Sequence, residues 1–183
     1  MAAFHGCPLR CRYCLNPQCN RPNSRTVKLT PQELYDRVKI DQLYFLATGG
    51  GVTFGGGEPA LHPDFITQFR ELCGPEWNIT LESSFNVPAE NVLKLFPVVN
   101  NYFIDLKDAN DDIYRRYTGQ SNLQVKENLE WLASQGIADR IIVRLPRIKD
   151  FNTEEDIQRS QHYLHDIGIQ HIDVFTYLTE IRK

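Results

Sequence analysis

The chain has 183 residues, of which 42% are hydrophobic and 23% are charged, a balance typical of one globular domain with a sizeable core. Its 20 Lys and Arg residues against 23 Asp and Glu residues give a formal net charge of −3, so no sequence-wide basic field favours nucleic acid or an anionic membrane as a partner. The sequence has no apolar run near the roughly 20 residues of a membrane span and no signal-peptide pattern, so we expect a cytosolic protein.

The stretch HGCPLRCRYCLNPQC follows a short apolar stub, AAF, and holds four of the five cysteines. In a reducing compartment, clustered cysteines more often bind a metal than form disulfides. Cys7, Cys11 and Cys14 have C-x3-C-x2-C spacing, so their thiolates can hold three irons of a cubane cluster and leave the fourth iron open. The alternative is a zinc site with Cys19 as fourth ligand. Because zinc ligands usually come as pairs from two separated segments, the spacing favours the cluster.

After the cysteines, β-branched or aromatic runs alternate with helical patterns. Thr30 suits an N-cap, Pro31 fits the first turn and Glu33 completes a capping box, so we predict a helix over the stretch LTPQELYDRV. Besides a stub at 2–4, the predicted strands span 51–56, 78–84, 101–107, 140–146 and 171–177. Further helices are predicted over 62–74, 89–96, 121–136 and 153–168.

This alternation predicts the architecture. A strand and helix recurring every ~25 to 40 residues are typical of βα units with a parallel sheet and right-handed crossovers. Five strands and a stub are too few for a closed eight-stranded barrel of ~250 residues, so we predict an α/β fold built as an open, partial barrel with outer helices. Ligands of such sheets bind beyond the carboxyl ends of the strands.

The stretch TGGGVTFGGGEPALHPDF places Gly55, Gly56, Gly57 and Glu58 at the carboxyl end of a predicted strand. Glycines allow close approach of a ligand to the backbone, and a glutamate offers an acceptor for an ammonium group. The spacing matches neither a P-loop nor a dinucleotide-binding fingerprint. A tight strand-to-helix turn would explain one or two of the glycines, but a run of three followed by Glu-Pro indicates a ligand site.

Together, CPLRCRYC and GGGEP resemble the radical S-adenosylmethionine (SAM) superfamily, because both motifs occur in that order on a matching βα framework. The resemblance covers nearly the whole chain and implies a single core domain over residues 1–183 with a partial (β/α)6 barrel of the radical SAM type. It implies a 4Fe–4S cluster on Cys7, Cys11 and Cys14, whose open iron is chelated by SAM. Reductive cleavage of SAM would give a 5′-deoxyadenosyl radical that abstracts hydrogen from a substrate.

Three stretches most resemble the glycyl-radical-enzyme activases, the group of pyruvate formate-lyase activating enzyme: GGGVTFGGGEPALHPDF, FIDLKDANDDIYRRYTG and RIIVRLPRIKDFN. The implied partners are a glycyl-radical enzyme or its glycine loop and a flavodoxin- or ferredoxin-type electron donor, with no nucleic acid and no membrane. Two other functions stay open. One is a compact radical SAM enzyme that acts on a small molecule or another peptide, and the other is a cysteine-rich zinc-binding module.

The resemblance also assigns site residues. Implied contacts with the cofactor are Tyr13, Leu15, Gly55, Gly56, Gly57, Glu58, Glu82, Ser83, Asp105 and Lys107. Tyr13 is expected near the adenine, the glycine motif near the methionine amino group, and a monovalent cation is suggested around Glu82 and Ser83. Substitution of Gly56 or Glu58 is expected to weaken SAM binding and to spare the cluster, since these positions lie on a different strand from the cysteines.

Asp105, Lys107 and Arg144 are implied to be catalytic residues at the strand tops, near a peptide-like substrate. Considered without the resemblance, Asp105 and Lys107 lie two apart on a strand and point to the same face, which predicts a simple ion pair. Arg144 is equally suited to pair with Asp150 or to cap a helix.

Overall fold

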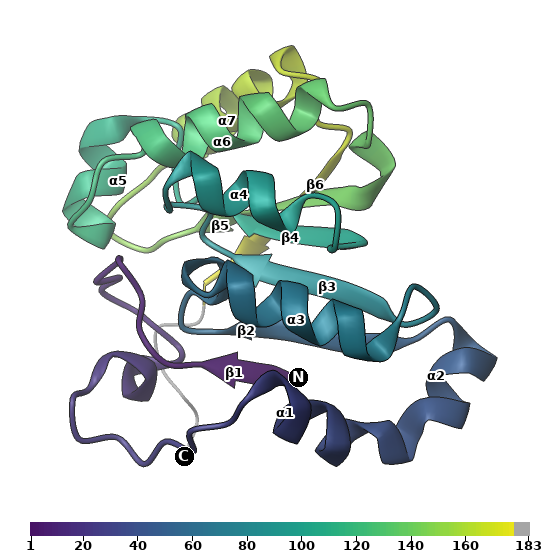
Figure 1. Cartoon of the computed structure of the whole chain (residues 1–183). Coiled ribbons are helices and arrows are strands. Elements are labelled where there is room, and N and C mark those ends of the chain that lie inside the picture. The colour runs from purple at the N-terminus through teal and green to yellow at the C-terminus, as the bar shows by residue number, and fades with distance from the viewer. Residues whose placement is uncertain (178–183) are drawn as a thin grey trace.

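The computed structural model describes residues 1–177, which form a six-stranded parallel sheet in the order β1-β2-β3-β4-β5-β6 (Figure 1). The strands are β1 (Ala2–Phe4), β2 (Gly51–Gly56), β3 (Asn78–Ser83), β4 (Asn101–Asp105), β5 (Ile141–Arg147) and β6 (His171–Thr176). Every neighbouring pair is parallel, and β1 and β6 form the two edges, so the sheet is not closed. The predicted α/β fold with an open, partial barrel is confirmed.

Helices cover the outer face of this sheet (Figure 1). They are α1 (Pro31–Val38), α2 (Gln42–Thr48), α3 (Pro63–Cys73), α4 (Ala89–Leu95), α5 (Asp111–Thr118), α6 (Leu123–Ser134) and α7 (Glu154–Asp166). Short 3-10 turns lie at Pro17–Asn20, Lys39–Asp41, Pro59–Leu61 and Ala138–Arg140. No helix within residues 1–177 has the length and apolar character needed to cross a membrane.

Helix capping follows the sequence signals. The Thr30 side chain accepts a hydrogen bond from the Glu33 amide, and the Glu33 side chain accepts one from the Thr30 amide, so the predicted capping box is present. The predicted helices α3, α4, α6 and α7 are confirmed within one or two residues at each end. Helices α2 and α5 were not predicted from the sequence, although Asn110 caps the start of α5 and Gly119, with φ of 78°, follows its end.

The alternation of side chains along the strands separates the core from the site. Ile79 and Leu81 of β3 are fully buried beneath the helices, together with Ile104 of β4. Because strand side chains alternate between faces, Glu82 and Asp105 lie on the opposite face, where they are only half-buried. The alternation of strand side chains with a period of two residues therefore buries the core residues on one face and places carboxylates on the inner face.

Candidate functional site

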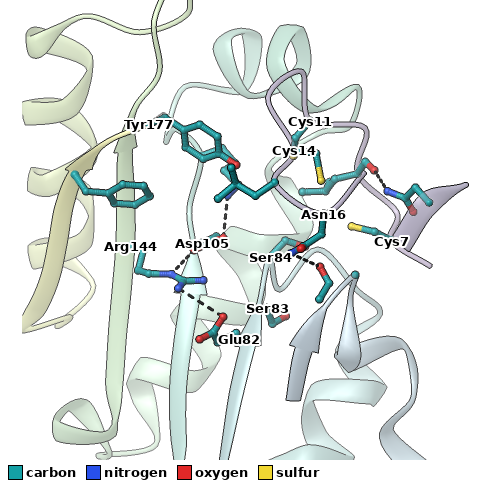
Figure 2. A pocket seen from close by; sticks show the side chains of 17 residues that line it. Cys7, Cys11, Cys14, Asn16, Glu82, Ser83, Ser84, Asp105, Arg144 and Tyr177 are labelled. Carbon is teal, nitrogen blue, oxygen red and sulfur yellow. Dashed lines mark hydrogen bonds and ion pairs between the residues drawn. The ribbon is translucent and has the colours of Figure 1, made fainter. Parts of the chain in front are cut away.

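A cavity of about 280 Å³ lies at the carboxyl ends of the strands, between the cysteine loop and the inner face of the sheet (Figure 2). Its walls come from the loop after β1, the ends of β2 to β5 and the end of β6 with Tyr177. The lining residues are Cys7, Leu9, Cys11, Cys14, Leu15, Asn16, Asn20, Gly56, Gly57, Glu82, Ser83, Ser84, Asp105, Lys107, Arg144, Phe175 and Tyr177.

The three spaced cysteines line one wall of this cavity, across from Arg144 and Glu82 (Figure 2). All three thiols are free and half-buried. Burial raises the pKa of Cys7 to about 12 and that of Cys11 to about 11, so both are thiols at neutral pH until a metal displaces their protons. A set of three thiols on one loop fits the chemistry of an iron–sulfur cluster.

Cys19 does not join this set. It lies in the 3-10 turn Pro17–Asn20, is buried, and is not among the residues that line the cavity. Within residues 1–177, no three His, Cys, Asp or Glu side chains converge as the ligands of a single metal ion must. The alternative of a zinc site with Cys19 as fourth ligand gains no support from these side-chain positions.

The glycine motif is bonded directly to the cysteine loop. The Gly57 amide donates to the Phe4 carbonyl at 2.9 Å, and the Glu58 amide donates to the Gly6 carbonyl at 2.7 Å. The approach is so close that a Cβ atom at Gly57 would lie 2.3 Å from the Gly6 carbonyl oxygen. The side-chain amide of Asn16 donates to the Gly56 carbonyl at 3.3 Å. The two motifs therefore form one structural unit, although more than 40 residues separate them in the sequence.

Helix α5 holds the other side of the cysteine loop. The Arg10 amide donates to the Thr118 carbonyl at 2.7 Å, and the Arg12 amide donates to the Tyr117 carbonyl at 3.1 Å. These carbonyls belong to the last turn of α5, where carbonyl oxygens have no amide donors within the helix. The backbone amides on both sides of Cys11 are thereby fixed to the body of the domain.

Glu58 faces away from the cavity and is completely buried. One carboxylate oxygen accepts from the Ala60 amide at 3.0 Å and the Ser83 hydroxyl at 2.6 Å. The other accepts from the Ser84 amide at 2.8 Å and the Ser84 hydroxyl at 2.6 Å. Burial raises the pKa of this carboxyl group, and the four hydrogen bonds oppose that rise. Glu58 therefore joins the end of β2 to the end of β3, and its oxygens are already occupied by these donors.

A network of opposite charges forms the wall across from the cysteines (Figure 2). Asp105 accepts from Lys107 Nζ at 2.9 Å and from Arg144 Nε at 2.6 Å, and Arg144 Nη1 lies 3.7 Å from Glu82 Oε2. The predicted ion pair of Asp105 and Lys107 is present. The register of β4 and β5 places Asp105 directly beside Arg144. Within residues 1–177, Arg144 forms ion pairs with Asp105 and Glu82 and not with Asp150.

The pKa values of this network follow from its charges. Burial would raise the pKa of Asp105, but the neighbouring Lys107 and Arg144 cations outweigh it and lower the pKa. Burial would lower the pKa of Lys107, but the Asp105 carboxylate outweighs it and raises the pKa. All three side chains are therefore charged at neutral pH. Two cations and two carboxylates on one wall fit a zwitterionic ligand such as an amino acid.

Most of the predicted site residues meet at the cavity, and three do not line it. Tyr13 packs its ring against Tyr117 and Phe151. Gly55 is buried in β2, and Glu58 lies beneath the wall. Six further lining residues were not predicted from the sequence: Leu9, Asn16, Asn20, Ser84, Phe175 and Tyr177. The only sequence signal for them is that they lie close along the chain to the cysteines, to Ser83 or to the last strand.

Glu58→Ala should destabilise the fold, because it leaves buried Ser83 and Ser84 donors without their acceptor. We expect a loss of about 3 kcal/mol in the free energy of unfolding, measured by urea denaturation of the metal-free protein. The matched control is Glu71→Ala on the exposed surface of α3, which should change stability by less than about 0.5 kcal/mol. A Glu58→Ala variant as stable as the Glu71→Ala variant would contradict the structural role.

Comparison with known proteins agrees with this geometry. Residues 1–172 match the family model of the radical SAM superfamily. The chain is 32% identical over 150 residues to the (2S)-3-sulfopropanediol dehydratase activating enzyme of Klebsiella oxytoca, covering 79% of this chain and 46% of that protein. It is 28% identical over 181 residues to the pyruvate formate-lyase-activating enzyme of Clostridium pasteurianum, covering 96% of this chain and 74% of that protein. The chain thus spans about half the length of the first of these relatives.

Solved structures share the fold. SuiB of Streptococcus suis, bound to S-adenosylmethionine, superposes with a TM-score of 0.69 at 14% identity, over 98% of this chain and 40% of that one. At that level of identity the likeness concerns the fold alone. The family model extends over nearly the whole chain and includes both the cysteine loop and the glycine motif that meet at the cavity. This protein belongs to the radical SAM superfamily.

Proposed function

We propose that this chain binds a 4Fe–4S cluster and SAM and activates a glycyl-radical enzyme by taking a hydrogen atom from one of its glycines. Residues 1–183 would act as a single radical SAM core domain. The observation that carries the proposal is that three free thiols and a balanced wall of charges face each other across one cavity. When bound, the cluster and SAM together supply a reductively generated 5′-deoxyadenosyl radical.

Cys7, Cys11 and Cys14 would hold the cluster, and the opposite wall would hold SAM. The Lys107 and Arg144 cations suit the carboxylate of its methionine part, and the carboxylate of Glu82 suits its ammonium group or a monovalent cation. The Ser83 hydroxyl donates a hydrogen bond to Glu58 at 2.6 Å. Ser83 therefore lines the wall, but its O–H is not free to donate to a ligand.

Asp105 would orient Lys107 and Arg144 as well as contact the ligand itself. Its two oxygens are shared between Lys107 and Arg144, which keeps both cations charged and fixes the direction in which they point. Such preorganised charges orient a bound zwitterion without further rearrangement. Leu15 and Leu9 add apolar lining beside the thiols, which helps to exclude water from a reactive radical.

The substrate we propose is a glycine loop that lies across the strand tops near Asp105, Lys107 and Arg144. The edges β1 and β6 do not pair with each other within the described residues, and we propose this unpaired side as the entrance for the peptide. The names of the relatives support this choice, because those proteins are activating enzymes of glycyl-radical enzymes. The electron would come from a flavodoxin- or ferredoxin-type donor.

The decisive experiment incubates anaerobically reconstituted protein with SAM, dithionite and a co-encoded glycyl-radical enzyme or its glycine-loop peptide. We expect a glycyl radical by electron paramagnetic resonance, and transfer of deuterium from the glycine α-carbon into 5′-deoxyadenosine. The Cys14→Ala variant is the matched control and should give neither signal. Turnover of a small metabolite, with no glycyl radical from any co-encoded candidate, would instead assign a compact radical SAM enzyme with another substrate.

A further inference from the structure

Each cation on the charged wall of the cavity contacts an aromatic ring as well as a carboxylate. Lys107 Nζ lies 2.9 Å from Asp105 Oδ2 and 5.7 Å from the centroid of the Tyr177 ring. Arg144 Nε lies 2.6 Å from Asp105 Oδ1, and Arg144 Cζ lies 6.0 Å from the centroid of the Phe103 ring. The face of an aromatic ring carries partial negative charge and attracts a cation within about 6 Å. Asp105 and a ring therefore both act on the direction of each cation.

Lys107 depends more on its ring than Arg144 does. The Lys107 side chain is 7% exposed, and within residues 1–177 only Asp105 accepts a hydrogen bond from its ammonium group. The Arg144 side chain is 26% exposed and has a second carboxylate nearby, since its Nη1 lies 3.7 Å from Glu82 Oε2. A cation shielded from water gains more from an aromatic face than an exposed one. The Tyr177 ring therefore gives Lys107 the second contact that Glu82 gives Arg144.

The protein itself holds the Tyr177 ring in place. The Tyr177 amide donates to the Arg147 carbonyl at 2.9 Å, which continues the pairing of β5 and β6 by one residue. The ring centroid lies 6.3 Å from that of the buried Tyr117 in α5 and 6.1 Å from that of Phe175 in β6. Tyr177 lines the cavity, and its side chain extends toward the cysteine loop (Figure 2). The ring is thus fixed before any ligand binds.

We propose that Tyr177 is a positioning residue that holds the Lys107 ammonium toward the cavity and so gives the site its preference for a ligand with a carboxylate. The proposal rests on the function proposed above, in which Lys107 and Arg144 bind the carboxylate of SAM. Tyr177 acts through Lys107. Contact with the ring limits the rotamers of the flexible lysine side chain, so less conformational entropy is lost when a carboxylate binds. Without the ring, Asp105 alone would direct the ammonium.

A ring that only filled space would affect every ligand alike. Phe175 provides this comparison, because it lies two residues before Tyr177 on the same strand face and also lines the cavity. Within residues 1–177, no Lys or Arg side chain lies over the Phe175 ring. Phe175→Leu is therefore the matched control for Tyr177→Leu. The conservative variant Tyr177→Phe keeps the ring face and removes only the hydroxyl.

The experiment compares the binding of two compounds to anaerobically reconstituted, unreduced protein. The first is SAM, and the second is decarboxylated SAM, which keeps the sulfonium and amino groups and lacks the carboxylate. Dissociation constants are measured by calorimetry for the parent and the three variants at equal iron and sulfide content. The Lys107 ammonium resonance is also followed by nuclear magnetic resonance in the metal-free proteins, without any ligand.

We expect Tyr177→Leu to weaken the binding of SAM about tenfold and that of decarboxylated SAM less than about twofold. Tyr177→Phe should keep the parent's ratio of the two dissociation constants, because the ring face remains. Phe175→Leu should change both constants by a similar factor and so leave their ratio unchanged. The Lys107 resonance should move in Tyr177→Leu, where the ring current beside the ammonium is lost, and stay near the parent position in Tyr177→Phe.

Three results would overturn the positioning role. The first is an equal loss of both compounds in Tyr177→Leu, and the second is equal binding of both compounds by the parent. The third is a loss of the preference for SAM in Tyr177→Phe, which would assign the effect to the hydroxyl. A parent that binds neither compound would overturn the proposed function instead. The Lys107 resonance would then decide the inference, since a shift in Tyr177→Leu supports the contact and an unmoved resonance overturns it.

Discussion

Replacing Cys7, Cys11 or Cys14 singly by Ala should abolish binding of the iron–sulfur cluster, whereas Cys73→Ala should leave it intact. The first three thiols line one cavity wall, and a cubane with a missing protein ligand loses its anchor at that iron. Cys73 lies at the end of α3, far along the chain from the loop, with its Sγ 3.8 Å from the Arg70 carbonyl oxygen. Iron and sulfide per chain after anaerobic reconstitution, with the absorption spectrum, are the quantities to measure.

Cys19→Ala separates the two metal alternatives. The cluster assignment predicts full iron and sulfide content in this variant, because Cys19 is buried outside the cavity. One zinc per chain, lost on Cys19→Ala, would contradict the cluster and assign a zinc-binding module. Equal iron in all of the cysteine variants would contradict any role for the three spaced thiols.

Gly57→Ala should disrupt both the cluster site and the fold around it. A Cβ at this position would meet the Gly6 carbonyl oxygen at 2.3 Å and the Phe4 carbonyl oxygen at 2.9 Å, and backbone atoms cannot move aside as a flexible side chain can. We expect a loss of about 3 kcal/mol in the free energy of unfolding, with a reduced iron content after reconstitution. Urea denaturation and iron analysis measure the two effects.

The matched control is Gly55→Ala, in the same glycine motif. Its Cβ would lie 3.4 Å from the Glu82 Cβ, an ordinary contact, so stability should fall by less than about 1 kcal/mol. If the two variants proved equally stable and bound equal iron, the close approach of the glycine motif to the cysteine loop would not matter. Gly56 is similarly crowded, since its Cβ would lie 2.7 Å from Ala3 Cβ and its φ is 90°.

This geometry changes one expectation drawn from the sequence. Because Gly56 and Gly57 lie against the stretch from Ala3 to Gly6, substitutions there disturb the cysteine loop as well as the cofactor side of the cavity. Selective loss of SAM binding, with the cluster spared, is therefore not expected of Gly56→Val. The Glu58 carboxylate has no free acceptor for SAM. Removing it should therefore affect the site through the displaced Ser83 and Ser84 side chains.

The sequence by itself determined the βα alternation, most strands and helices, and the two motifs. These features depend on local physics: side-chain alternation with period two, helix caps such as Thr30, and the short spacing of Cys7, Cys11 and Cys14. The helix α5 was not predicted, although Ile113, Tyr114 and Tyr117 among its eight residues, DDIYRRYT, are buried on one side of the helix. Its eight residues give only two turns of that pattern, so the signals that mark it in the sequence are its caps, Asn110 and Gly119.

Tertiary structure alone decided which distant groups meet. Asp105 and Arg144 are 39 residues apart and become neighbours through the register of β4 and β5. The attachment of the cysteine loop to the glycine motif on one side and to α5 on the other depends on backbone hydrogen bonds between residues 52 to 108 positions apart, which no local pattern encodes. Tertiary packing also decides the direction of a side chain. Glu58 points into the protein because Ser83, Ser84 and Ala60 donate hydrogen bonds to its carboxylate there.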